Sequence, residues 1–158
     1  MALLTVNGKD YEAKVTFKFD KLADLKYSKE NEKGEEQGGF SNIYMGLLDA
    51  KHKYLVAFWD CAFAHLKGNR PNVDEIEEAL ETKLEAEDDI TPLFEEAFRA
   101  LDKSGFFKLT VKKYWKNMEL FGEVGKNEEE KLQNKKAVEM TKESRALMLG
   151  ETIPSSTE

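Results

Sequence analysis

The sequence predicts an α+β fold that is predominantly α-helical, with an N-terminal β-hairpin packed on a bundle of about five to six helices and a marginal C-terminal helix or tail. The pair Asn7-Gly8, between two alternating runs, predicts the hairpin. Several later stretches carry apolar residues at helical spacing and are separated by turn or capping residues, which predicts the bundle. A chain of 158 residues that is 41% hydrophobic and 35% charged is large enough to bury a core.

Both the turn and the strands indicate the hairpin. An Asn-Gly pair readily adopts the two positive φ angles of a type I′ turn. In the second run, Tyr11 to Phe19, apolar side chains alternate with polar ones, as in a half-buried strand. Because we expect no later strand, the hairpin either covers the helical core or offers its edges to another protein. Its candidate protein-interaction residues are Val15, Phe17 and Phe19.

The helices follow in order along the chain. A short helix is expected from near Asp20, then helices over Phe40 to Leu48 and His52 to Lys67, the last apolar on nearly every side and therefore central. Asn72 and Glu75 form a capping box for the helix that follows, and Thr91 caps the next one. A last core helix lies within FFKLTVKKYWKNMELFG.

These elements predict one domain over residues 1–125. It consists of the hairpin with the short helix (1–27), a mobile loop rich in glycine and charge (28–39) and a helical part (40–125). Residues 126–158 are expected to form a polar helix or tail that is partly disordered.

No pattern in the sequence indicates catalysis, a cofactor or a bound metal, so we expect none and no enzyme activity. Cys61 stands alone in an apolar run, and His52 and His65 are too far apart on one helix to share a metal. The stretch from Asp102 has the rhythm of a calcium-binding EF-hand, but Phe106 falls where an oxygen ligand is required.

Charge is distributed unevenly along the chain, whose net charge is -7. The segment 72–89 holds nine acidic residues and one lysine, a net of -8, whereas 99–116 holds six basic residues and one acidic residue, a net of +5. These segments are either solvated helix faces, surfaces that steer a second copy or another protein, or, for the basic one, a site for an anionic ligand. Because the acidic segment of one copy could meet the basic segment of another, we also expect self-association.

Aromatic side chains lie between the lysines of this basic segment. Core packing explains them more simply than stacking on single-stranded nucleic acid, because the net charge of the chain is negative. The sequence also has no basic and apolar leader pattern and no stretch that could span a membrane, so we expect neither export nor insertion. Candidate protein-interaction residues here are Phe106, Phe107, Tyr114 and Trp115.

A family resemblance covers the chain up to Lys103. It is carried by NGKDYEAKVTFKFDKLADLKY, then IYMGLLDAKHKYLVAFWDCAFAHLK, then RPNVDEIEEALE and LFEEAFRAL. In this order they resemble the tail assembly chaperones of long-tailed bacteriophages that infect Gram-positive bacteria, which similarly begin with an NGKxYxxxFxF hairpin and continue to an acidic helix.

The resemblance implies a non-catalytic protein of the host cytoplasm. Its implied partners are the tape measure protein, which it coats and keeps soluble, and the tail tube protein, which it helps to recruit, and it is absent from the mature virion. Two alternatives stay open: a structural tail or connector component that remains in the virion, and a helical nucleic-acid-binding regulator that uses the basic segment 99–116.

Overall fold

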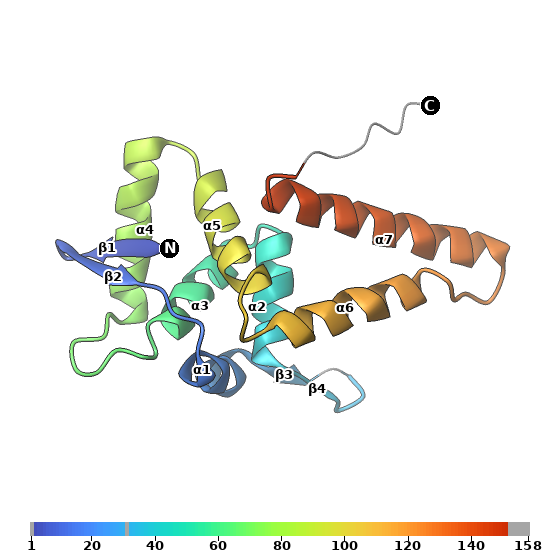
Figure 1. Ribbon diagram of the computed structural model, residues 1–158, viewed down its shortest axis with the longest axis horizontal. Coiled ribbons are helices and arrows are strands. Elements are labelled where there is room, and N and C mark those ends of the chain that lie inside the picture. Colours follow the sequence, from blue (N-terminus) through green and yellow to red (C-terminus); the bar gives the residue numbers. More distant parts are fainter. Residues whose placement is uncertain (1, 31, 152–158) are drawn as a thin grey trace. The chain divides into compact units, whose positions relative to one another are not determined.

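A computed structural model describes residues 2–30 and 32–151 (Figure 1). It confirms the α+β, helix-dominated fold. The elements are β1 (Leu3–Val6), β2 (Lys9–Glu12), α1 (Phe17–Tyr27), β3 (Lys29–Glu30), β4 (Glu36–Gln37), α2 (Gly39–Leu48), α3 (His52–Ala62), α4 (Val73–Glu87), α5 (Thr91–Asp102), α6 (Lys108–Phe121) and α7 (Glu128–Met148).

The chain divides into two compact units, Met1–Leu101 and Asp102–Glu158. The first unit holds both hairpins and helices α1 to α5 up to Leu101. The second holds α6 and α7. The sequence analysis places domain limits elsewhere, at residues 125 and 126, and those limits stay a prediction.

The N-terminal hairpin turns as the sequence predicts. Asn7 and Gly8 have φ angles of 51° and 79°, as a type I′ turn requires, and Val6 pairs with Lys9 across it. Leu4 and Val6 on β1 are 1% and 2% exposed, and β1 packs on α4. The hairpin is therefore a cover on the helical core of the first unit.

The second strand is shorter than predicted, because β2 ends at Glu12. Thr16 is the N-cap of α1: its side chain accepts a hydrogen bond from the backbone N–H of Phe19. A capped helix start therefore replaces the predicted strand end. Phe17 and Phe19 are two residues apart, which places them on nearly opposite sides of a helix. Phe17 is accordingly 73% exposed and Phe19 is fully buried.

The core of the first unit is built around α1, α2 and α3, which pack on one another. Close approach depends on glycine: a Cβ on Gly39 would overlap the carbonyl group of Ala23, and a Cβ on Gly46 would overlap the ring of Tyr54. The helix predicted to be central, α3, contributes the buried Phe58 and Trp59. It ends at Ala62 rather than Lys67, because turns with i to i+3 hydrogen bonds follow it.

The capping box predicted for α4 is present. The Asn72 side chain accepts from the backbone N–H of Glu75, and the Glu75 carboxylate accepts from the backbone N–H of Asn72. The predicted loop 28–39, however, contains a second antiparallel hairpin in which Lys29 pairs with Gln37. The expectation that no strand follows the first hairpin is therefore wrong, although the mobility of this segment stays a prediction.

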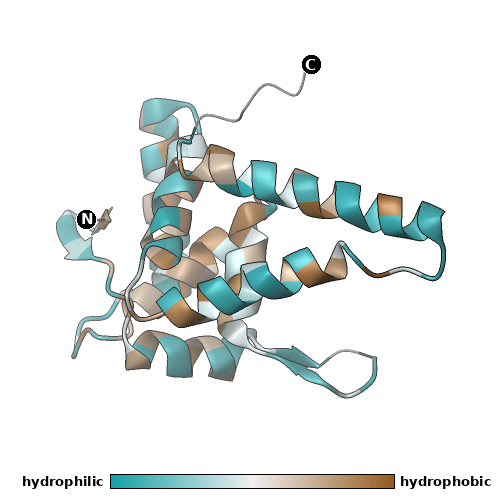
Figure 2. Ribbon diagram, turned by 45° about the vertical axis from the view of Figure 1, so that its right-hand side comes forward, coloured by the Kyte–Doolittle hydropathy of each residue, from teal (hydrophilic) through white to brown (hydrophobic). Residues whose placement is uncertain are grey.

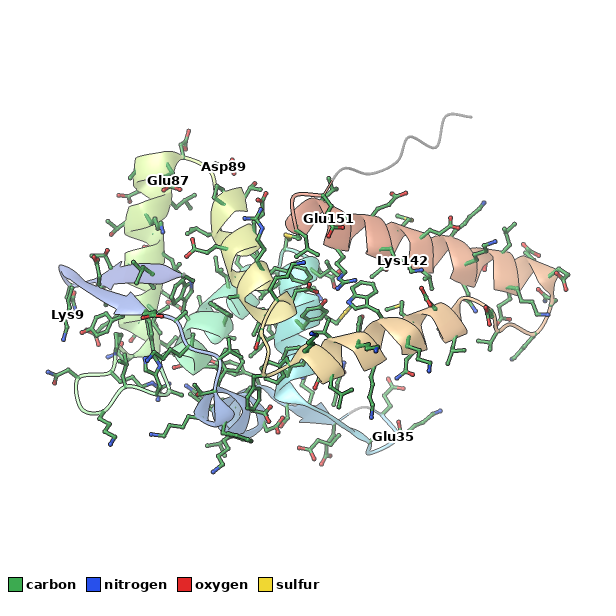
Figure 3. The ribbon with its side chains drawn as sticks, viewed as in Figure 1. Lys9, Glu35, Glu87, Asp89, Lys142 and Glu151 are labelled. Carbon is green, nitrogen blue, oxygen red and sulfur yellow. The ribbon has the colours of Figure 1, made fainter. Side chains whose placement is uncertain are left out.

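In the second unit, α6 and α7 lie side by side, with Val138 of α7 buried at 5% exposure. Lys142 on α7 forms a 2.8 Å ion pair with Glu119 on α6, and Figure 3 labels Lys142 on the side of α7 that faces α6. Arg145 forms an ion pair with the buried Asp102 at 3.0 Å. Residues 152–158, part of the predicted tail, lie outside the described residues.

Candidate functional site

The residues proposed from the sequence for protein contact do not form one surface in the first unit. Phe19 is buried, and Val15 is half-buried ahead of α1. Only Phe17 is mostly exposed, and it lies on a helix rather than on the predicted strand. The arrangement of all three on one strand face is therefore wrong, while protein binding by these residues stays a prediction.

The proposed residues of the second unit are mostly covered. Phe107 and Trp115 are 3% and 7% exposed, whereas Phe106 and Tyr114 are half-buried. The Arg145 guanidinium lies 4.9 Å from the centre of the Trp115 ring. The lysines between these aromatics are exposed, as the helical period predicts.

A buried carboxylate joins three segments of the first unit. Asp60 near the end of α3 is 2% exposed and accepts hydrogen bonds from Lys26 Nζ at 2.6 Å and from the Tyr27 hydroxyl at 2.8 Å. Arg70 completes the cluster by donating to Asp60 Oδ1 at 2.6 Å and to the Asp60 carbonyl at 2.9 Å. The cluster ties the ends of α1 and α3 to the connection that leads into α4.

The surroundings of Asp60 keep the Tyr27 hydroxyl and the Cys61 thiol neutral. Desolvation, and then the hydrogen bond to Asp60, raise the pKa of the Tyr27 hydroxyl above its ordinary value. Desolvation, and then the charge of Asp60, raise the pKa of the Cys61 thiol to about 12, so this buried thiol is a poor nucleophile. The sequence analysis missed the cluster, although one aspartate within the apolar run YLVAFWDCAFAHL was a visible signal.

An apolar groove lies between α3 and α4, and we call it the α3–α4 groove. Its cavity volume is about 330 Å³. Leu55, Val56, Leu80, Leu84 and Ile90 supply its apolar lining. Val56, Leu84 and Ile90 are half-buried, so the core does not use their apolar surface fully.

Charged and polar residues border this groove. Glu77 and Glu81 line it from α4, and His52 and Lys53 line it from α3. The His52 ring lies 5.7 Å from the Phe94 ring of α5, and Lys53 Nζ lies 4.9 Å from the centre of the Tyr54 ring. The four-residue spacings of Glu77 with Glu81 and of Leu80 with Leu84 were signals for this groove that the sequence analysis did not combine.

A second groove of about 490 Å³ lies between the N-terminal hairpin and α4. It is the more polar of the two, with Thr5, Glu75 and Glu78 among its lining residues. The Asn7 amide donates to Glu75 Oε2 at 2.6 Å, which links the turn to the first turn of α4. Among the described residues, neither strand of this hairpin pairs with a third strand.

Comparison with protein families identifies the chain. A family model described as phage tail assembly chaperone protein, TAC, matches residues 3–116. The chain belongs to this family. Comparisons with curated proteins and with solved structures find no match. The resemblance stated from the sequence is therefore confirmed.

The matched region of this tail assembly chaperone contains both grooves and the Asp60 cluster, and it leaves out α7. The family places the role of the chaperone in phage tail assembly and its partners among tail proteins. Among the described residues, no three acidic, histidine or cysteine side chains gather as a metal site. No helix in the described part of the chaperone is long and apolar enough to cross a bilayer.

Proposed function

We propose that this chaperone is a non-catalytic protein that binds the tape measure protein in the host cytoplasm, keeps that helical chain soluble and helps to recruit tail tube subunits. The α3–α4 groove is the observation that carries the proposal. It combines half-buried apolar side chains with two glutamates along its α4 side, and it lies within the part of the chain that matches the family.

A groove of this kind suits an amphipathic helix. Such a helix places residues at i, i+3 or i+4, and i+7 into an apolar groove, and the backbone hydrogen bonds of the helix are already satisfied. Each large apolar side chain that becomes buried contributes about 1.5–3 kcal/mol before the cost of association is subtracted. Covering the apolar face of a client in this way removes the surface through which client chains aggregate.

The α4 side of the groove specifies the charge of the client helix, whereas His52 and Lys53 border the α3 side. Glu77 and Glu81 lie four residues apart on α4, so they occupy one side of the groove. A helix with lysine or arginine beside its apolar face complements them, which affects association rate and register more than affinity. Phe17, which is exposed on α1, is a further proposed contact with tail proteins.

The decisive experiment is co-expression with the tape measure protein. The unmodified chaperone should keep the client soluble and co-purify with it. Leu84→Lys places a charge in the groove, and the double variant Glu77→Lys, Glu81→Lys reverses its border, so each should lower the captured client at least about tenfold. The matched control, Glu85→Lys with Glu87→Lys, makes the same charge change on α4 outside the groove and should retain capture.

Two outcomes contradict the proposal. One is an unmodified chaperone with which the tape measure protein stays insoluble and unbound. The other is equal loss of capture in the groove variants and in the control, since that result makes net charge rather than the groove responsible. Circular dichroism on each variant verifies that the helices are retained.

The alternatives make different predictions. A structural component would be detected by mass spectrometry in purified virions, whereas a cytoplasmic chaperone would be absent from them. A nucleic-acid-binding regulator that uses the basic segment 99–116 would bind DNA or RNA with a strong salt dependence. Base stacking on Trp115 is disfavoured, because this side chain is 7% exposed and lies against Arg145. Protein binding therefore explains the first unit and the basic helix α6 better than base stacking does.

A further inference from the structure

Helix α7 carries an exposed stripe of five residues, which we call the α7 stripe: Leu132, Lys136, Met140, Glu143 and Leu147. Its three apolar members are 53%, 68% and 62% exposed in that order. At 100° per residue the five positions fall within an arc of about 80°. Figure 2 shows hydrophobic residues recurring between hydrophilic ones along this helix.

Four of the five stripe residues face away from α6, whereas Leu132, at the edge of the stripe, also lines a groove between α6 and α7. Val138, which is buried, lies about 120–180° around α7 from the members of the stripe. Lys142, which forms an ion pair with Glu119 of α6, also lies outside the arc. Among the described residues, Lys136 and Glu143 take part in no ion pair.

The order of the stripe is self-complementary when one copy is reversed. If two α7 helices lie antiparallel with a two-fold axis between positions 139 and 140, Leu132 of each copy is level with Leu147 of the other. Lys136 is then level with Glu143. The two Met140 positions lie next to the two-fold axis, offset from each other by about 1.5 Å along the direction of the helices. Every contact occurs twice, as a two-fold interface requires.

We propose that α7 is a self-association element through which two copies of the chain pair in an antiparallel, two-fold arrangement. Charge complementarity selects this occupant and this direction. A parallel pair in register would bring Lys136 against Lys136 and Glu143 against Glu143, which is repulsive, whereas the antiparallel pair makes two Lys136–Glu143 contacts. Because α7 lies outside residues 3–116, this inference goes beyond the proposed function.

The pairing has the strength expected of a small interface. One helix face on each side is at the low end of the area of specific complexes, so we expect weak association that requires a high chain concentration. This contact differs from association of the acidic segment 72–89 with the basic segment 99–116, which involves no residue of the α7 stripe.

Charge reversal tests which residues meet. Sedimentation equilibrium of the full chain at low salt should show a monomer–dimer equilibrium. Lys136→Glu and Glu143→Lys should each raise the dissociation constant at least about tenfold, because each reversal makes two like-charge contacts. The double variant carrying both changes should return to within about threefold of the unmodified chain. Lys126→Glu, outside α7, is the matched control and should leave association unchanged.

Cysteine cross-linking tests the direction of the helices. With a copper–phenanthroline oxidant, Met140→Cys should cross-link two copies efficiently. Leu132→Cys alone should not, because its two copies would lie about 22 Å apart, but a mixture of Leu132→Cys with Leu147→Cys should. A cross-link in Leu132→Cys alone as strong as in Met140→Cys would overturn the antiparallel arrangement.

A chain that stays monomeric at several hundred micromolar would overturn the proposal, and so would single charge reversals that leave association unchanged. Co-purification of the tape measure protein with Lys136→Glu separates this proposal from the proposed function, because the groove residues are unaltered in that variant. Retained capture with lost dimerisation supports the α7 contact independently of client binding.

Discussion

At the scale of single residues, Asp60 joins three segments of the first unit. Its carboxylate accepts from a lysine and a tyrosine of α1 and from Arg70. The carboxylate is buried, while the Lys26 and Arg70 side chains are 40% and 31% exposed, so the two cations keep part of their hydration. Such an arrangement costs less than a fully buried triad and still fixes where three segments meet.

We expect Asp60→Ala to lower the free energy of unfolding by about 2–3 kcal/mol, because it leaves the Tyr27 hydroxyl without its acceptor and Arg70 without its carboxylate partner. Urea denaturation followed by circular dichroism measures this loss. Glu95→Ala breaks the surface pair with Arg99 and should cost about 0.5 kcal/mol or less. Equal losses in the two variants would show that the cluster contributes no more than a surface ion pair.

The Cys61 thiol predicts a loss of stability in alkali. Burial raises its pKa to about 12 from an ordinary value of 9.0, so above pH 9 the unfolded chain releases this proton while the folded chain keeps it. The unfolded state then binds fewer protons, and stability falls as pH rises from about 9 to about 12. Below pH 9 the contribution is fully present.

We therefore expect the unfolding free energy to fall more steeply with pH in the unmodified chain than in Cys61→Ala, by up to about 1.4 kcal/mol per pH unit between pH 9.5 and 11. Urea denaturation at a series of pH values measures both slopes. Tyr27 contributes in the same direction in both proteins, so the difference reports the thiol together with its smaller effect on the pKa of Tyr27. Parallel slopes would show that the thiol ionises equally in both states.

At the scale of elements, the crossing of α1 and α2 depends on a missing side chain. A Cβ at Gly39 would meet the backbone of Ala23, which cannot rotate away. A Cβ at Gly46 would meet Cβ, Cγ and the ring of the buried Tyr54, so rotation of the ring relieves only part of the overlap and α3 must shift for the rest. Asp24 also accepts a hydrogen bond from the Gly39 N–H at 2.9 Å, so α1 supplies an acceptor for a backbone N–H that has no partner within α2.

The expected order of destabilisation is Gly39→Ala, at about 3 kcal/mol, then Gly46→Ala, at about 1–2 kcal/mol. Gly105→Ala should cause no loss, because a Cβ there meets nothing within 4 Å. Thermal and urea denaturation of the three variants measure this order. A Gly39→Ala protein as stable as Gly105→Ala would show that the two helices can separate without cost.

Some local sequence signals are sufficient to predict an element, and others are not. The turn at Asn7-Gly8 and the capping box at Asn72 and Glu75 were predictable, because each depends on neighbours within a few residues. The end of β2 was not predictable. Val15, Phe17 and Phe19 alternate with polar residues as in a strand, but Thr16 can equally cap a helix. Three alternating residues do not distinguish a strand from a helix start, and packing of Phe19 in the core decides between them.

At the scale of the whole molecule, the two units differ in how much apolar surface they bury. The largest fully buried side chains all lie in the first unit, among them Trp59, Tyr44 and Phe98. The second unit leaves Leu109, Leu120 and Phe121 of α6 about half exposed or more. The first unit therefore has its own packed core, and the second unit has apolar surface available for other chains.

The sequence by itself determined the fold class, the positions of most helices and the family, because period, caps and motif order are properties of the chain alone. Only the tertiary structure revealed the Asp60 cluster and the α3–α4 groove. Each joins residues that are distant in sequence: Lys26 with Asp60 and Arg70, or Leu55 with Leu84. The periodicity of the sequence does not specify which distant residues come into contact, because that depends on how the helices pack.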